Sequence, residues 1–289
     1  MSARIEQAAE LAMKLGQQHL APYGSAKSRH DFTQRRLMSC LVLKAYLKTS
    51  YRGVVDWLDG HGALRKILGL EQKLPHYTAL QKFSARPEVG AVAEALVARI
   101  GRAALRSQGT KAAVAIDSTG LEPTGASAHY VSRTGRRRSK YLKVSLSIVC
   151  GSLLPLGLVL DWGPNDDKCQ AFELLDKSFS AAGTHLPAQL LADAGYDADW
   201  LHGVCREVWG RAKLGQSCGA SSRWQPPGRV LSAQDEQRAL KKNGCGRRWH
   251  IESFISALKR FYGSTLTARR ELCQRHEATL RILAYALHR

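Results

Sequence analysis

The chain has 289 residues, of which 44% are hydrophobic, so it is long and apolar enough for a folded protein of one or two domains and is not a disordered chain. Lys and Arg number 43 against 24 Asp and Glu, which gives a formal net charge of +19. Such an excess of positive charge usually accompanies nucleic acid or, less often, an anionic membrane surface. No Lys-rich amphipathic helix with a Trp or Leu face is obvious, so we favour nucleic acid.

The cysteines and the apolar segments indicate the compartment. The seven cysteines are widely spaced and form no C-x-x-C pair, so they give no support to a structural zinc site and are interpreted as free thiols in a reducing compartment. The N-terminal segment 1–16 is amphipathic and charged, unlike a signal peptide. The most apolar stretch, 144–162, is interrupted by Gly and Pro and is not expected to span a bilayer. We therefore expect a cytoplasmic protein without a membrane partner.

Residues 1–108 are predicted to form an all-α N-terminal domain. Apolar residues recur there at helical spacing, and Gly, Pro and Ser separate the segments expected to be helical, which are 5–15, 31–47, 51–58, 74–83 and 89–105. Asp31 is the expected N-cap of the second helix. A compact, basic bundle of short helices is typical of DNA-binding modules. A dimerisation or packing domain is an equally good interpretation.

From residue 109 to 289 the pattern changes to strands mixed with helices, which predicts an α/β domain. The expected strands are 112–116, a hairpin of 141–150 and 153–162 that turns at Gly151, then 190–192 and 208–214. The expected helices are 168–182, 244–263 and 271–289. Residues 215–243 are rich in Gly, Ser and Pro and are predicted to be a loop insertion, with a short helix near 233–241.

Three acidic residues stand at the positions where ligand sites collect in α/β domains. Asp117 and Asp193 each follow a short apolar strand, and Glu252 lies in helix 244–263. Each acid alone is weak support, because an Asp at a strand end often only caps a turn. Together they offer hard oxygen ligands from separate elements, which suit Mg²⁺. Two such ions about 3.5–4 Å apart could clamp the attacking and leaving oxygens of a phosphoryl transfer.

Basic residues accompany these acids. Arg248, Glu252 and Lys259 lie four and seven residues apart, so they share one side of the helix beside its apolar stripe. They form either an exposed salt-bridge ladder, worth about 0.2–0.5 kcal/mol per pair, or a metal-binding carboxylate whose cationic neighbours hold phosphate. A basic run in the loop before the hairpin is usually only solvated, but its position here favours contact with DNA phosphates; its members are Arg133, Arg136, Arg137, Arg138 and Lys140.

Three blocks of the sequence resemble the bacterial insertion-sequence transposases of the DDE type. AIDSTGLEPTG resembles the block of the first Asp and points to Asp117, and LLADAGYDADWL resembles the block of the second Asp and points to Asp193. RRWHIESFISALKRFYG resembles the third block, whose signature is Tyr, two residues, Arg, three residues, Glu, six residues and Lys. Arg248, Glu252 and Lys259 match its last three positions.

Three positions depart from the family's pattern. Cys245 stands at the Tyr position, Ala194 where the family often has Lys or Arg, and Ala286 where relatives commonly carry Asn. The departures leave the acidic triad intact. Because of them, one alternative is that the protein is a repurposed or decayed transposase that acts only as a DNA-binding protein. A further alternative is an RNase H-like nuclease that cuts DNA without strand transfer.

The resemblance implies a fold and a mechanism. It implies an RNase H-like mixed sheet flanked by helices, and two Mg²⁺ ions, with Mn²⁺ as a substitute, bound by Asp117, Asp193 and Glu252. Water would cut double-stranded DNA at the terminal inverted repeats of the element, and the freed 3′-hydroxyl would attack target DNA. Arg248 and Lys259 would hold the strand. We expect a homodimer in the DNA complex, in a bacterial cytoplasm and associated with the nucleoid.

Overall fold

The computed structural model of the protein describes residues 2–27, 29–109, 112–123, 141–196, 200–201, 203–204, 213–214 and 247–289. These residues form two compact units. The first takes its described residues from 1–97, 123–130 and 265–289, and the second from 98–122 and 131–264. The domain limits predicted from the sequence, 1–108 and 109–289, stay a prediction.

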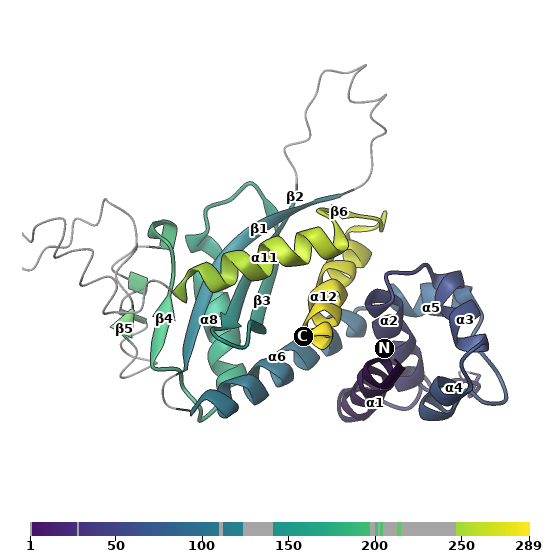
Figure 1. Ribbon diagram of the computed structural model, residues 1–289. Helices are drawn as coiled ribbons and strands as arrows, with labels where there is room; N and C mark the ends of the chain where they lie inside the picture. The colour runs from purple at the N-terminus through teal and green to yellow at the C-terminus, as the bar shows by residue number, and fades with distance from the viewer. Residues whose placement is uncertain are drawn as a thin grey trace, which may run out of the picture. The chain divides into compact units, whose positions relative to one another are not determined.

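The first unit is helical. Its elements are α1 (Ser2–His19), α2 (Gln34–Tyr46), α3 (Tyr51–Asp59), α4 (Gly62–Leu68), α5 (Tyr77–Ser84), the first part of α6 (Glu88–Gln108), β6 (Thr265–Leu266) and α12 (Glu271–His288). Helices α1 and α12 both pack against α2, whose Met38, Leu41 and Leu43 are fully buried (Figure 1). The predicted N-terminal helices are therefore confirmed, and α4 is an additional helix that the sequence analysis did not identify.

Helix caps in this unit show where the local sequence decides an element and where it does not. The Ser50 hydroxyl accepts a hydrogen bond of 3.0 Å from the Gly53 amide and so begins α3, as N-cap serines commonly do. The prediction that Asp31 caps α2 was wrong, because the helix begins at Gln34 after Thr33. Asp31 instead forms an ion pair of 2.9 Å with Lys73, a partner far along the chain that helix-capping rules cannot reveal.

The second unit is a mixed sheet packed against helices. Its described strands are β1 (Ala113–Pro123), β2 (Tyr141–Val149), β3 (Leu154–Gly163), β4 (Gln189–Leu191) and β5 (Lys213–Leu214), in the order β3-β2-β1-β4-β5. Strands β1, β2 and β3 are antiparallel neighbours, whereas β4 is parallel to both β1 and β5. The unit also contains the helices α8 (Lys168–Ala182) and α11 (Trp249–Tyr262), the end of α6, and a short 3-10 turn, η2 (Ala194–Tyr196). The predicted fold class, consistent with an RNase H-like α/β fold, is confirmed.

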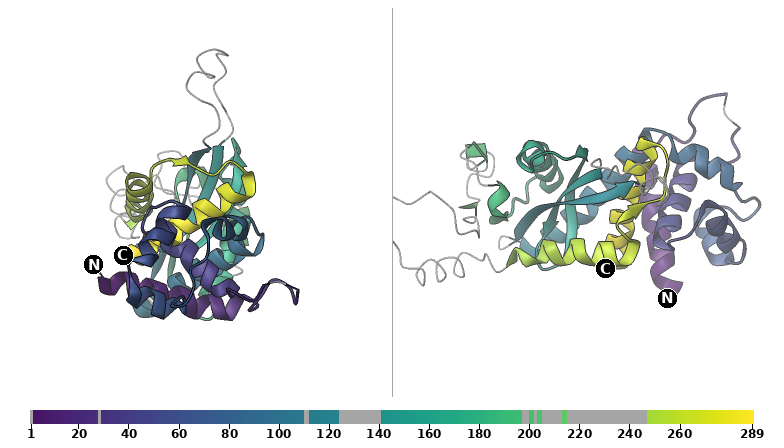
Figure 2. Two further views of the ribbon diagram at one scale, coloured as in Figure 1. Left: turned by 90° about the vertical axis from the view of Figure 1, so that its right-hand side faces the viewer. Right: turned by 90° about the horizontal axis from the view of Figure 1, so that it is seen from above.

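Helices α8 and α11 lie on opposite faces of this sheet (Figure 2). Helix α8 covers β2 and β3, and its Leu174 and Leu175 join a core with Val114 and Ile116 of β1. Helix α11 runs along the other face and buries the predicted apolar stripe of Ile251, Phe254, Ile255 and Leu258. Phe261 continues the helical spacing of that stripe but is exposed, and the helix ends at Gly263, whose φ of 79° suits glycine.

Strand β1 is longer than the sequence predicts. The prediction that it stops at Asp117 was wrong, since the strand continues to Pro123 and Asp117 lies near its middle. Beyond Asp117, Ser118 and Gly120 pair with Ser145 and Lys143 of β2. Pairing with a long neighbouring strand outweighs the weak strand preference of these residues.

Helix α6 lies close to β3 at Gly101, and this contact gives a stability prediction. A Cβ atom at Gly101 would lie 2.4 Å from the Pro155 carbonyl oxygen and 2.5 Å from Leu156 Cα. We expect Gly101→Ala to destabilise the chain by about 1–3 kcal/mol, because backbone atoms must move. Gly62→Ala is the matched control, as nothing lies within 4 Å of its Cβ position. Thermal unfolding should therefore show a lower midpoint for Gly101→Ala alone, and equal midpoints would contradict the contact.

Two findings bear on the predicted compartment. Among the helices of the described residues, none is long and apolar enough to cross a membrane. Cys40, Cys150, Cys169 and Cys273 carry free thiols, as predicted, and burial raises the pKa of the Cys40 thiol to about 12. Such a thiol stays protonated and behaves as a small apolar side chain. Cys205, Cys218 and Cys245 lie outside the described residues.

Candidate active site

Two aspartates lie near each other, Asp117 on β1 and Asp193 two residues after the end of β4. Strands β1 and β4 are parallel, and Ala115 is level with Leu191. If the same register continues two residues further along the chain, Asp117 is level with Asp193. Side chains alternate along a strand, so Asp117 projects on the face opposite to that of Ile116, which lies in the core beneath α8. Asp117 therefore faces the side of the sheet that α11 covers.

The electrostatics of Asp117 reflect this neighbourhood. Burial raises the pKa of Asp117 to about 6, and the negative charges of Asp193 and Asp167 act in the same direction. The Ser118 amide donates to Asp117 Oδ1 at 2.7 Å and, with the charge of Arg248, lowers the same pKa. A half-buried carboxylate whose pKa is raised by neighbouring negative charges binds a proton or a cation more tightly than an isolated one does.

A tyrosine completes the surroundings of the two aspartates. Tyr196 follows Asp193 by one turn of η2 and is almost fully buried. Burial raises the pKa of Tyr196, and the charges of Asp167, Asp117 and Asp193 add to that shift. The phenol is therefore neutral at physiological pH, and its ring belongs to the core that α8 covers. Sequence analysis did not identify Tyr196, since nothing in the local pattern distinguishes it from an ordinary core residue.

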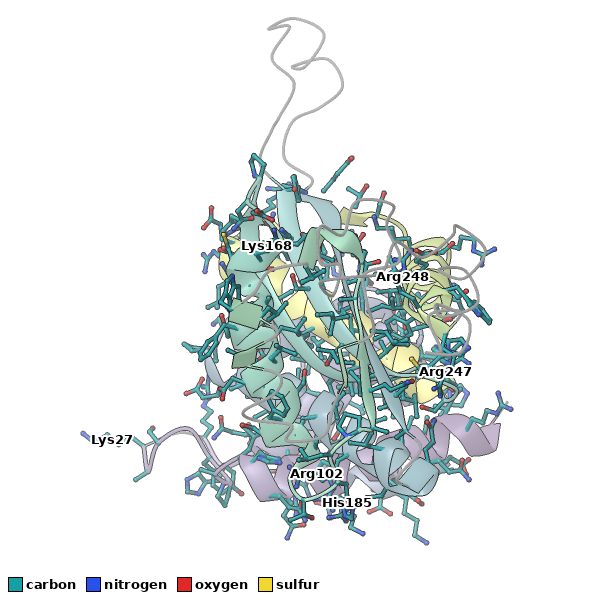
Figure 3. All side chains as sticks on the ribbon, turned by 90° about the vertical axis from the view of Figure 1, so that its left-hand side faces the viewer. Lys27, Arg102, Lys168, His185, Arg247 and Arg248 are labelled. Atoms are coloured by element: carbon teal, nitrogen blue, oxygen red, sulfur yellow. The ribbon has the colours of Figure 1, made fainter. Side chains whose placement is uncertain are left out.

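Glu252 is connected to the two aspartates by its ion pair with Arg248. Arg248 stands just before α11 and its guanidinium lies 2.5 Å from Glu252 Oε1, one helical turn later. Because the charge of Arg248 also acts on Asp117, the arginine connects the glutamate to the strand that carries the first aspartate. Figure 3 shows Arg247 and Arg248 on the α11 side of the sheet, away from Lys168 at the start of α8.

The donor set fits a divalent cation in part. Asp193 Oδ1 is buried and accepts no hydrogen bond from any described residue, so it is free to bind a cation. Carboxylates of Asp117 and Asp193 are the hard oxygen ligands that Mg²⁺ prefers. Within the described part of the chain, however, no three Asp, Glu, His or Cys side chains are gathered closely enough to hold one ion. The ligand role of Glu252 stays a prediction, and it requires the side chain to turn from Arg248 towards the aspartates.

The remaining predicted residues are placed as follows. Lys259 lies on α11 two turns after Glu252 and is half-buried, and its contact with DNA stays a prediction. The basic run, Arg133, Arg136, Arg137, Arg138 and Lys140, lies outside the described residues, as does the whole of the predicted loop insertion at 215–243.

The sequence analysis missed a further carboxylate, Asp167. It predicted a helix from residue 168 but assigned no role to Asp167, which directly precedes α8. The structure shows that it also pairs with the buried Lys143 and influences the pKa of Asp117. The sequence carried no clear signal for this pair, because Lys143, Ser145 and Ser147 alternate with apolar residues along β2, a pattern that predicts an exposed polar face.

Comparison with known proteins identifies the family. A family model described as the transposase DDE domain matches residues 108–287, which include β1 to β5 and α11. The chain belongs to the transposase DDE domain family. No curated protein matches the chain.

Membership of this family has chemical consequences. A transposase DDE domain implies a phosphoryl-transfer enzyme that acts on DNA, and DDE transposases generally use divalent metal ions. The predicted recognition as a DDE transposase is confirmed at this level. The matched range contains Asp117, Asp193 and Glu252, but their individual roles stay predictions.

Proposed function

We propose that the protein is an insertion-sequence transposase of the group with the Tyr-Arg-Glu-Lys signature, which cuts DNA at the ends of its element and joins them to target DNA. The observation that carries this proposal is the parallel pairing of β1 with β4 within the matched DDE domain, which places Asp193, two residues after β4, near enough for its charge to raise the pKa of Asp117. The net charge of +19 supports a polyanionic substrate. The Cys at position 245 and the Ala at 194 and 286 leave a DNA-binding protein without cleavage as the competing outcome.

Each residue of the site has a task in this proposal. Asp117, Asp193 and Glu252 would hold two Mg²⁺ ions, with Mn²⁺ as a substitute, and bound ions stabilise charge on the attacking and leaving oxygens. Arg248 keeps Glu252 oriented in the free protein and offers its guanidinium to a DNA phosphate when Glu252 turns away. Tyr196 and the core beneath it limit the access of water to the carboxylates.

The deciding experiment is incubation of the full chain with Mg²⁺ and a linear DNA that carries the sequences flanking its reading frame, including their terminal inverted repeats. The expected products are cleaved ends followed by ends joined to a target plasmid. Asp117→Asn is the matched inactive control. Cleavage without joining would identify a nuclease, and a gel shift without cleavage would identify a repurposed DNA-binding protein.

The predicted basic run gives a separate prediction about binding. If Arg133, Arg136, Arg137 and Arg138 contact phosphates, replacing them with Ala should weaken binding to every DNA sequence alike. The slope of log K against log salt should flatten by about 0.9 for each lost contact. The measurement is DNA affinity at several salt concentrations, with Lys27→Ala in the first unit as the comparison. An unchanged slope would show that the run is only a solvated loop.

A further inference from the structure

A buried ion pair lies on the face of the sheet opposite to Asp117. The Lys143 side chain is only 4% exposed, and its Nζ lies 2.5 Å from Oδ1 of Asp167. The same ammonium group donates to the Asn165 carbonyl oxygen at 2.6 Å. Burial alone would raise the pKa of Asp167, but the hydrogen bonds from Lys143 and Ser118 outweigh it and hold that pKa below its ordinary value. Asp167 is therefore a fixed negative charge beneath the sheet.

Ser118 connects this pair to Asp117. Its hydroxyl donates to Asp167 Oδ1 at 2.5 Å, and its backbone amide donates to Asp117 Oδ1 at 2.7 Å. Successive side chains point to opposite faces of a strand, so Ser118 reaches Asp167 on the α8 face while its amide fixes a carboxylate on the α11 face. A rotation of this one peptide unit would disturb both contacts.

The register of the sheet explains why these groups meet. Ser118 is level with Ser145, and Gly120 is level with Lys143, so all four residues share the α8 face. Asp167 at the start of α8 then approaches Ser118 and Lys143 together. The contact is set by three separate elements, β1, β2 and α8, and is therefore a property of the folded unit.

We propose that the Lys143–Asp167 pair, acting through Ser118, holds the Asp117 carboxylate in the position that divalent-ion binding requires. This inference rests on the proposed function, because it assigns Asp117 to the ion-binding site. Lys143, Asp167 and Ser118 are positioning residues, since none of them needs to touch DNA or the ion. Hydrogen-bond partners that orient a ligand typically affect metal affinity or activity by about 10–100-fold.

The competing explanation is that the pair only anchors α8 to the sheet. A second contact further along β2 provides the comparison, because Ser147 Oγ lies 2.7 Å from Ser178 Oγ of α8. Both serines are fully buried, and Ser147 is level with Ile116 on β1, one residue before Asp117. Ser147→Ala thus removes a buried hydroxyl between the same strand and the same helix without touching the chain of contacts that leads to Asp117.

The test compares Ser118→Ala with Ser147→Ala in the full-length protein. The first readout is the Mn²⁺ concentration that gives half of the ion-induced rise in unfolding temperature, and the second is kcat for end cleavage at saturating DNA. Ser118→Ala should raise the Mn²⁺ midpoint by roughly tenfold or more and lower kcat, with unchanged DNA affinity. Ser118→Thr keeps the hydroxyl and should restore both values. Ser147→Ala should lower the unfolding temperature but leave the Mn²⁺ midpoint unchanged.

A double variant tests the ion pair itself. Asp167→Asn alone leaves a buried ammonium group without its partner and endangers folding, whereas an apolar replacement of a whole buried pair is often tolerated. Lys143→Met combined with Asp167→Leu should therefore fold and show the Mn²⁺ defect of Ser118→Ala. Adding Ser118→Ala to this double variant should cause no further loss, because all three changes break one path.

The outcomes separate the two proposals. Equal Mn²⁺ midpoints in wild type, Ser118→Ala and Ser147→Ala, or no Mn²⁺ response in any of them, would overturn the positioning role. Equal defects in both serine variants would overturn it as well, since α8 anchoring would then suffice. A Mn²⁺ defect confined to Ser118→Ala in a protein that never joins DNA would uphold the positioning role and refute strand transfer.

Discussion

The change Glu252→Gln should lower the rate of DNA cleavage by more than about a hundredfold while DNA binding persists. Glutamine keeps the size of the side chain and most of its helix preference, but it removes one negative charge from the proposed ion site. Mg²⁺ gives up its water reluctantly and depends on carboxylate charge, so its binding should suffer most. Arg248 and Lys259 remain in place, and the loss of a negative charge near phosphate should not weaken the complex.

The structure provides a control for this experiment. Glu252 is half-exposed and pairs with Arg248 at 2.5 Å, an exposed type of ion pair that contributes about 0–1 kcal/mol to stability. Glu173 on α8 pairs with Lys177 at 3.2 Å with the same spacing of four residues and a similar exposure. Glu173→Gln should thus reproduce any effect on stability and have no effect on cleavage.

A gel shift and a cleavage assay on the same Glu252→Gln protein distinguish three roles. Cleavage near the wild-type rate would show that Glu252 only forms a surface salt bridge, and the proposed site would lose its third acid. Loss of binding together with cleavage, in a folded protein, would show that Glu252 organises the DNA-binding surface. Loss of cleavage alone is the result that the ion-binding role predicts.

Where signals are local, the sequence predicts the fold well. Helix 168–182 is predicted with the bounds that α8 has, since polar residues precede it and Gly183 ends it. The β2–β3 hairpin follows from the alternation of its strands around Gly151. The extension of β1 beyond Asp117 could not be predicted in the same way, because it depends on pairing with residues of β2 such as Leu142, the partner of Leu121, that come much later in the chain.

The candidate site shows the same division. Asp117 and Asp193 can be found from the sequence, because each follows a short apolar stretch and matches a family block. Lys143 is harder to interpret, since alternation along β2 predicts that it faces solvent. It is buried because α8 covers that face with polar partners, Asp167 for the lysine and Gln170 for Ser145. Only the packing of α8 on the sheet brings these partners together.

The largest loss of stability is expected from Glu277→Gln in α12 of the first unit. The Glu277 side chain is 15% exposed and lies 2.6 Å from the guanidinium of Arg281, which is 11% exposed. It also accepts hydrogen bonds from the Thr267 hydroxyl at 2.8 Å, from the Thr267 amide, and from the Ala268 amide at 2.8 Å. Arg281 in turn donates to the Thr265 carbonyl oxygen at 2.9 Å, so one ion pair fixes segment 265–268 onto α12.

Glu277→Gln removes the negative charge that pairs with the buried guanidinium of Arg281. It also replaces one carboxylate oxygen, an acceptor, with an NH2 group that would face backbone amides. Together these changes should lower the free energy of unfolding by about 3 kcal/mol. The unfolding temperature should fall by roughly 5–10 °C, whereas Glu271→Gln at the exposed start of the same helix should cost at most about 1 kcal/mol.

The effect of Glu277→Gln on stability has a defined pH dependence. Burial raises the pKa of Glu277, but Arg281 and the hydrogen bonds outweigh it and bring the pKa below its ordinary value of 4.5. A carboxylate with a lowered pKa stabilises the folded chain above that ordinary value, and this contribution is lost as the pH falls through the lower, folded-state pKa. The difference in unfolding temperature between wild type and Glu277→Gln should therefore be full at pH 7 and should close on acidification below pH 4.5. A gap that stays constant over this range would show that packing, and not the charge of Glu277, holds segment 265–268 to the helix.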